Sequence, residues 1–442
     1  MAGVKILNYE LSPAPATIFG CLLPAPWMGV LTGLLLAFGP QQGLPDRFSP
    51  LTLALTHCLA LGMLAPIMIG ALFQLMPVVA GQAVTGARKI APFVALGSAL
   101  IAVGLSLGFL QASNAGFVFA GVLALLLYGA ITLALLTAAC EVAVVDATTR
   151  TLRWIVLALL LVVALGISLA GNFAGWWQLD VIYLLDLHVG WGLTGWIATL
   201  VVGIASTTVP MFWQTKRPSA SWQRALPGVL WLPLLLAFWP ALQPFALLLT
   251  CLVIFLLASI SFVTIWRAKR RFDPAWSLWL VCAASYMCAA LLAVFKHIGG
   301  SILPDFILPD FILPDFISPD FILQTLPWWI GVLVLVGGAV LPVNAMLGKI
   351  IPFLVFMHLR RQTPMGQRVP TMQAVLPPQR LRWQAHSVLL AFGLLLLLPL
   401  APGWLAVAAG IAFSLSQAYL GSLLITCLLR YRHELKAVFL AE

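Results

Sequence analysis

The chain has 442 residues, of which 62% are hydrophobic and only 8% are charged, and its mean hydropathy is +1.06. An ordinary soluble domain is about a quarter charged, so this composition excludes a soluble globular enzyme, a disordered protein and a disulfide scaffold. It also argues against a β-barrel, whose strands are short and alternate in polarity. The composition therefore predicts an all-α integral membrane protein, with one polytopic domain over residues 1–442.

Apolar runs of about 20 residues, enough to cross roughly 30 Å of hydrocarbon, recur along the chain. They predict about twelve transmembrane helices, at residues 16–39, 50–80, 90–111, 115–140, 153–176, 182–213, 225–242, 244–267, 275–297, 326–357, 384–402 and 404–429. The seventh and eighth are the least distinct pair, because Pro240 and Pro244 leave only a tight connection between them. The first run lacks a convincing cleavage site, so we expect it to be retained.

The basic residues give these spans an orientation. The chain has 23 Lys and Arg, and all but Arg47, Lys296 and Lys349 fall on one side of the twelve predicted spans. Cytoplasmic loops carry the excess of Lys and Arg, so we predict a bacterial inner-membrane protein with both termini and the basic loop 358–383 in the cytoplasm. The formal net charge of +10 is then explained by the basic loops of a protein that spans a lipid bilayer, and it does not indicate a nucleic-acid partner. Seven scattered cysteines without a CxxC motif indicate buried thiols.

Spans two, six and ten share one spacing of small residues before a proline. The first small residue lies eight residues before the second, and the second lies seven residues before the proline. The three sets are Gly62, Gly70 and Pro77; Gly195, Gly203 and Pro210; and Gly337, Ala345 and Pro352. Small residues at these spacings lie on one helix face and allow close helix contact, which ordinary packing would also explain. We favour three four-helix units around a pseudo-threefold axis, because membrane proteins commonly repeat a unit and place sites where units meet.

Three histidines fall near the outer ends of predicted spans. His57 and His188 lie 20 and 22 residues before the prolines of spans two and six, and His297 ends span nine. Imidazole is a common ligand of haem iron and copper, and a histidine within hydrocarbon needs a partner. We therefore take all three as candidate cofactor ligands, and His57 and His188 also as candidate metal ligands. A hydrogen bond to a neighbouring carbonyl, or a place at the interface, is the alternative.

Other polar residues are secondary candidates, and none has a pattern that identifies a catalytic residue or an enzyme. Asp186 could orient the free N–H of His188, although exposure at the outer surface also explains it. Lys349, inside span ten, could serve a proton path or a haem propionate, but snorkelling inward is the interpretation that we favour. Gln74 is a candidate for an interhelical hydrogen bond. The remaining histidines are expected to be solvated at the cytoplasmic edge: His358, His386 and His433.

Together, the twelve spans, the cytoplasmic termini, the four-span periodicity and the outer-end histidines resemble subunit I of the haem-copper oxidases. The stretches THCLALGMLAPIMIGALFQLMPV and DLHVGWGLTGWIATLVVGIASTTVPMF are also similar in style to the NnrS-type haem- and copper-containing membrane proteins. This resemblance implies that His57 holds haem, that His188 holds copper or a second haem, and that His297 replaces a missing span-ten ligand.

The chain also departs from the oxidase pattern. Span ten has Ile330 and Val332 where a histidine is expected, span seven has no histidine, and Gly192 stands where a tyrosine would follow His188. The resemblance therefore implies haem or copper binding without a complete oxygen-reducing centre.

The function implied in this way is a nitric oxide or oxygen response, or respiratory metal physiology. The haem would be b-type, because no CxxCH is present to attach a c-type haem. A respiratory electron donor and other membrane subunits are the implied partners. Two other classes stay open: a secondary transporter, and a metal-free assembly or scaffold protein on the oxidase fold. The outer loop 302–323, with four ILPDF-like copies, is expected to be irregular and without an essential role.

Overall fold

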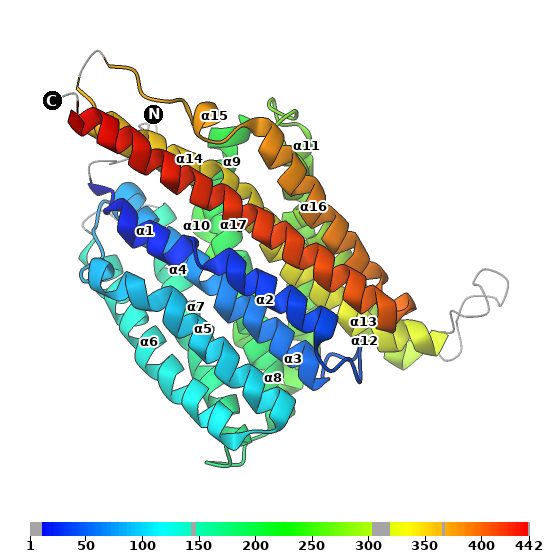
Figure 1. Cartoon of the computed structure of the whole chain (residues 1–442). Helices are drawn as coiled ribbons and strands as arrows, with labels where there is room; N and C mark the ends of the chain where they lie inside the picture. Colours follow the sequence, from blue (N-terminus) through cyan, green and yellow to red (C-terminus); the bar gives the residue numbers. More distant parts are fainter. Residues whose placement is uncertain (1–10, 143–146, 303–318, 365–366, 441–442) are drawn as a thin grey trace.

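The computed structural model describes residues 11–142, 147–302, 319–364 and 367–440, and within these ranges it contains helices and no strand. Eleven helical stretches of the described residues are long and apolar enough to cross a membrane. Figure 1 shows them as long rods lying side by side. The chain is therefore a multi-pass, all-α membrane protein, as predicted from its composition.

Five of these eleven spans are single helices, and the other six consist of consecutive helical segments. In chain order they are α1 (Pro15–Leu22) with α2 (Ala25–Phe38); α3 (Pro50–His57), η2 (Cys58–Leu64), α4 (Ala65–Leu75) and η3 (Met76–Ala80); α5 (Ala87–Gln111); α6 (Asn114–Glu141); α7 (Ala147–Phe173); α8 (Val181–Gly190), η4 (Trp191–Ala198) and α9 (Thr199–Trp213); η5 (Pro240–Leu242) with α11 (Gln243–Trp266); α12 (Trp276–Ile302); α13 (Pro319–Gly331), η6 (Val332–Val340) and α14 (Leu341–Gln362); α16 (Pro378–Leu397) with η7 (Leu398–Leu400); and α17 (Pro402–Leu440). Two shorter helices, α10 (Ala220–Leu236) and α15 (Met372–Val375), complete the described chain.

The helix boundaries correct several sequence-based expectations. The seventh predicted span, 225–242, corresponds to α10, which has 17 residues, ends at Leu236 and is not among the eleven candidate spans. The predicted basic loop 358–383 is partly helical, because α14 runs to Gln362, α15 covers Met372–Val375 and α16 begins at Pro378. Long basic side chains can reach water from the end of a helix, so the helices continue past the apolar runs that predicted them.

The ILPDF segment is only partly described. Residues 303–318 lie outside the described residues, so the expectation of an irregular loop applies there and is not tested. The last copy is different, because Pro319 and the residues after it begin α13. Proline is tolerated in the first turn of a helix, where no intrahelical N–H bond is lost.

Three of the broken spans contain a π-helical segment at the same register. The segments η2, η4 and η6 begin 19, 19 and 20 residues before Pro77, Pro210 and Pro352. The segment η6 packs against both η2 and η4, so the three segments meet inside the bundle. π-helical turns are rare and often lie at functional sites.

One glycine of the predicted spacing in each of these three spans makes a close contact. Gly70 and Gly203 lie seven residues before the proline of their span, whereas Gly337 lies fifteen residues before Pro352. In each case the contact is with the span just before it in the chain: a Cβ at Gly70 would lie 2.8 Å from Cys21, one at Gly203 would lie 2.9 Å from Thr151, and one at Gly337 would lie 2.6 Å from the Ser285 Cβ. Small residues are therefore required where each of these helices crosses its predecessor.

The first and last spans close the bundle. A Cβ at Gly33 of α2 would lie 2.5 Å from the Gly410 carbonyl oxygen of α17, and the Ser414 hydroxyl donates to the Val30 carbonyl at 2.9 Å. Figure 1 shows α2 and α17 side by side, with α1 beginning and α17 ending at the same end of the bundle. Large apolar side chains are exposed around the outside, including Leu126 of α6, Leu252 of α11 and Leu390 of α16, as expected for helices that face lipid.

Candidate functional site

His57 and His188 hold one ring nitrogen in the same way. His57 ends α3 directly before η2, and its Nδ1 lies 2.7 Å from the Leu53 carbonyl oxygen. His188 lies in α8, three residues before η4, and its Nδ1 lies 3.1 Å from the Val162 carbonyl oxygen of α7. A carbonyl only accepts, so each Nδ1 carries the proton and donates it. This tautomer leaves the Nε2 lone pair of each ring for a ligand, which is the usual arrangement of a metal-binding histidine.

The fold brings these two imidazoles into one neighbourhood. His188 and His57 are close enough to interact electrostatically, although they lie on different spans. A Cβ at Gly166 of α7 would lie 3.1 Å from the His188 Cε1, so a glycine leaves room for this ring. The sequence-based prediction placed both histidines at one depth and did not single out Gly166.

Aromatic side chains line the His57 side of the site. The His57 ring centroid lies 5.3 Å from that of Phe109 on α5, and Phe109 in turn packs edge-on against Phe117 and Phe173. Phe117 and Phe173 stack on each other at 5.2 Å. These rings give the imidazole an apolar wall, and they come from three different helices, so the sequence alone did not reveal the cluster.

His297 and Asp186 lie at the charged end of the same region. Lys296, next to His297 on α12, interacts electrostatically with Asp186 of α8 and with Arg47 of the α2–α3 connection. Asp186 is exposed, and the Nδ1 of His188 is engaged by a carbonyl oxygen and not by this carboxylate. In the described part of the chain, no group of three or more His, Cys, Asp or Glu is placed to hold a metal ion. His297 therefore does not complete a three-residue ligand set there.

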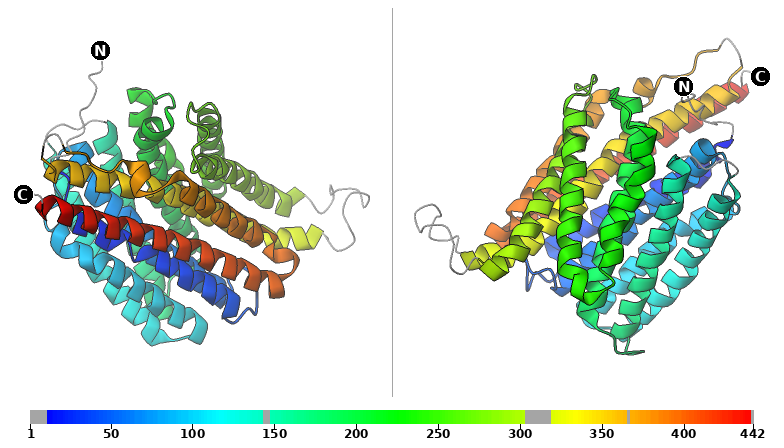
Figure 2. Two further views of the ribbon diagram at one scale, coloured as in Figure 1. Left: turned by 45° about the horizontal axis from the view of Figure 1, so that its top comes forward. Right: turned by 180° about the vertical axis from the view of Figure 1, so that it is seen from behind.

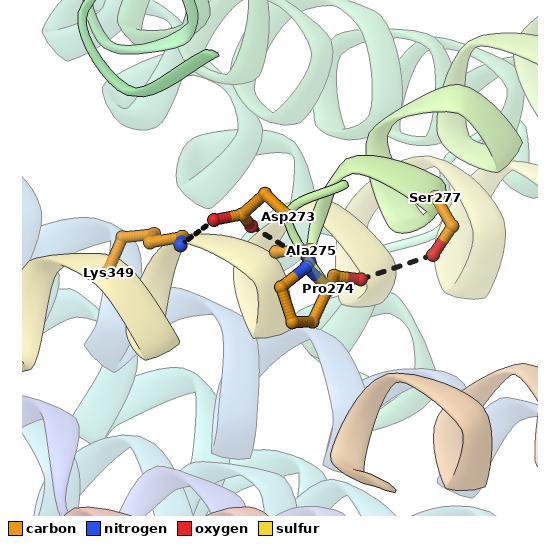
Figure 3. A network of polar contacts seen from close by, with 5 residues as sticks. All are labelled: Asp273, Pro274, Ala275, Ser277 and Lys349. Atoms are coloured by element: carbon orange, nitrogen blue, oxygen red, sulfur yellow. Dashed lines mark hydrogen bonds and ion pairs between the residues drawn. The ribbon is translucent and has the colours of Figure 1, made fainter. Parts of the chain in front are cut away.

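Lys349 has a partner that the sequence did not reveal. Its ammonium forms an ion pair with Asp273 in the α11–α12 connection, and both side chains are mostly buried, at 16% and 19% exposed. The other carboxylate oxygen of Asp273 accepts from the Ala275 backbone N–H at 3.0 Å (Figure 3). Lys349 thus does not snorkel inward to water, as the sequence favoured. It forms a buried ion pair that ties α14 to the segment just before α12. An Asp-Pro pair ahead of a helix was the available signal for Asp273.

The other secondary candidates have mixed outcomes. The Gln74 amide donates to the Ser12 hydroxyl at 3.0 Å, so Gln74 links α4 to the segment before α1. His386 and His433 are exposed, as expected, but His358 is only 8% exposed and its predicted solvation is wrong. Five of the seven cysteines are buried, whereas Cys140 and Cys288 are exposed.

Comparison with known proteins does not identify a relative of this chain. No family model matches the chain, and no curated protein matches it significantly. A functional assignment therefore depends on the architecture and on the side chains described above.

Proposed function

We propose that the protein is a haem-binding protein of a bacterial inner membrane, in which His57 holds the iron of a b-type haem through Nε2. His188 either completes the coordination of the same iron or holds a copper ion beside it. One observation carries this proposal: two imidazoles on different spans lie within electrostatic range of each other, each with Nδ1 fixed on a carbonyl oxygen and Nε2 left over.

The arrangement of the spans supports an architecture like that of the oxidase core. Three helices carry a π-helical segment at nearly the same register, and each sets a glycine against the preceding span, at equivalent positions in spans two and six. This is the pattern expected of three four-helix units around a pseudo-threefold axis. A chain that begins and ends at the same end of the bundle needs an even number of crossings, so α10 would be the twelfth span. The basic connections would then place both termini in the cytoplasm.

The residues present fit axial ligation of haem and do not fit a binuclear oxygen-reducing centre. Two imidazoles suffice for a haem iron, whereas Ile330 and Val332 occupy the span-ten positions where the oxidases have a ligand. When bound, haem would supply binding of a diatomic gas such as nitric oxide or oxygen, or exchange of an electron with a respiratory donor. The chain's own residues would orient the ligand rings through Leu53 and Val162, and would exclude water with the Phe109 cluster.

An absorption spectrum tests this proposal most directly. Protein purified from cells supplied with haem and copper should show a Soret band and bound iron. His57→Ala should remove or shift the band, because it deletes an axial imidazole. His386→Ala is the matched control, since His386 is exposed on α16 and is not a proposed ligand. This variant should leave the band unchanged.

His188→Ala separates the two versions of the proposal. If His188 completes the same iron, the spectrum of the variant should change from six- to five-coordinate haem. If His188 holds copper, the variant should lose copper and keep its haem. A colourless, metal-free protein would refute the proposal, and a secondary transporter or a scaffold on the same fold would become the better interpretation.

A further inference from the structure

A second site lies away from the histidines, in a cavity between α9, α11 and α12. The cavity has a volume of about 140 Å³. Figure 2 (right) brings this side of the bundle, drawn in green, to the front. It is bounded largely by small and branched apolar side chains. Thr215, Lys216 and Gln223 lie at the end where α9 leads into the α9–α10 connection, and a few polar residues, among them Ser206 and Ser261, lie further along the groove.

The apolar part is a groove that follows one face of α9. Its lining positions repeat every three or four residues, from Ala198 at the end of η4 through Val202 and Ala205 to Val209 of α9. The eleven helical steps between Ala198 and Val209 extend about 17 Å, which is close to one leaflet of a hydrocarbon core about 30 Å thick. The groove is open to the outside of the bundle, because Ile260 on its edge is 54% exposed. Its dimensions therefore suit an acyl chain that lies along the protein.

The mouth of the groove carries hydrogen-bond donors that have no partner. The Trp279 Nε1–H and the Thr215 hydroxyl are both buried and unbonded within the described residues, and the Trp279 side chain is only 6% exposed. A buried donor without an acceptor costs about 1–3 kcal/mol. An occupant with acceptor oxygens at this depth would satisfy both groups.

The charge at the mouth is positive. Lys216 is exposed and lines the cavity, and Gln223 lies beside it, while no Asp or Glu is among the lining residues. The nearest acid of the α11–α12 connection, Asp273, is already paired with Lys349. Juxtamembrane Lys and Arg attract anionic lipid headgroups, so the mouth favours an anion.

We propose that this groove binds an anionic phospholipid, with one acyl chain along α9 and with its phosphate and ester oxygens at Lys216, Thr215 and Trp279. The site needs a headgroup and a chain together, because the polar mouth and the apolar groove are continuous. It does not involve His57 or His188, so it stands apart from haem binding.

Native mass spectrometry of the detergent-purified protein tests the proposal. One phosphatidylglycerol per chain should persist, and after delipidation added phosphatidylglycerol should rebind more strongly than phosphatidylethanolamine of the same acyl length. Lys216→Gln should weaken this binding about fivefold, since one lysine near a headgroup contributes about a factor of this size. Lys89→Gln removes a charge from the first turn of α5, outside the groove, and should have no effect.

A second pair of variants tests the apolar part. Ala205→Phe places a ring in the groove and should abolish retention of the lipid. Ala124→Phe makes the same change at a half-buried position of α6, away from the groove, and should not. Equal binding of the two phospholipids, or binding that Ala205→Phe leaves intact, would overturn the proposal.

Two further outcomes identify a different occupant. Inorganic phosphate should not displace the lipid, and displacement would show that the mouth is only an anion site. The Tyr286 hydroxyl, at the deep end of the groove, is also buried and unbonded in the described structure. An isoprenoid quinone would place a carbonyl there, so co-purified quinone whose binding is weakened by Tyr286→Phe would replace the lipid proposal. A phospholipid should be insensitive to this variant.

Discussion

The contact between α2 and α17 provides a stringent test of the packing. Gly33→Ala would place a methyl group 2.5 Å from the Gly410 carbonyl oxygen and against the Ser414 hydroxyl. Both neighbours belong to one helix, and one of them is backbone, so the two helices must separate. Overpacking of this kind costs about 1–3 kcal/mol. The Ser414–Val30 hydrogen bond would weaken as well, at about 0.6 kcal/mol for a bond between membrane helices.

Gly393→Ala is a control with the opposite expectation. Gly393 lies inside α16, and a Cβ there meets nothing within 4 Å. Alanine in a helix interior is favoured over glycine by about 0.5–1 kcal/mol, so this variant should be at least as stable as the parent. Heating detergent-solubilised protein and measuring the surviving monodisperse fraction would compare the two. If Gly33→Ala melts at or above the parent temperature, the close approach of α2 and α17 is wrong.

Three other predictions address topology, the ion pair and the repeat loop. A reporter fused after Arg271 should be cytoplasmic and one inserted within residues 303–318 should be external, and the reverse at either point would contradict the predicted orientation. Asp273→Asn should lower the free energy of unfolding by about 3 kcal/mol, because it leaves the Lys349 ammonium buried without its counter-charge. Adding Lys349→Met to this variant should restore most of that loss. A melting temperature that Asp273→Asn leaves unchanged would argue against the ion pair. Deleting two ILPDF copies should leave expression and any Soret band unchanged, and loss of the band would show that this loop contributes to the site.

Sequence patterning predicted those parts of the fold that depend on hydrocarbon thickness and residue size. Long apolar runs predicted nearly every spanning helix, and the spacing of Gly70 and Gly203 predicted a packing face that the structure confirms. The ends of helices were less predictable, because helical hydrogen bonding continues into the interface after the apolar residues stop. Gln362 at the end of α14 and Pro378 at the start of α16 are examples.

The candidate site was predictable only in part. Sequence identified His57 and His188 because a histidine in an apolar run is unusual, but the carbonyl that holds each ring depends on local geometry and, for His188, on a different helix. The pairing of Lys349 with Asp273 joins residues 76 positions apart. Residue type and spacing do not reveal a contact between two residues that lie so far apart in the sequence.

The π-helical segments relate the histidines of spans two and six to the glycines of the same two spans. A π-helical turn takes up more residues than an α-helical turn, so it rotates the following helix about its axis and changes the face turned toward a neighbour. In spans two and six the histidine lies just before the segment, and the glycines Gly70 and Gly203 lie after it. The histidine can thus lie near the other histidine while the glycine, 13 residues further on in span two and 15 in span six, packs against the preceding span. Span ten keeps the segment without a histidine before it, and its close glycine, Gly337, lies within the segment and not after it. This is expected if the segment serves packing in all three spans and ligand binding in only two.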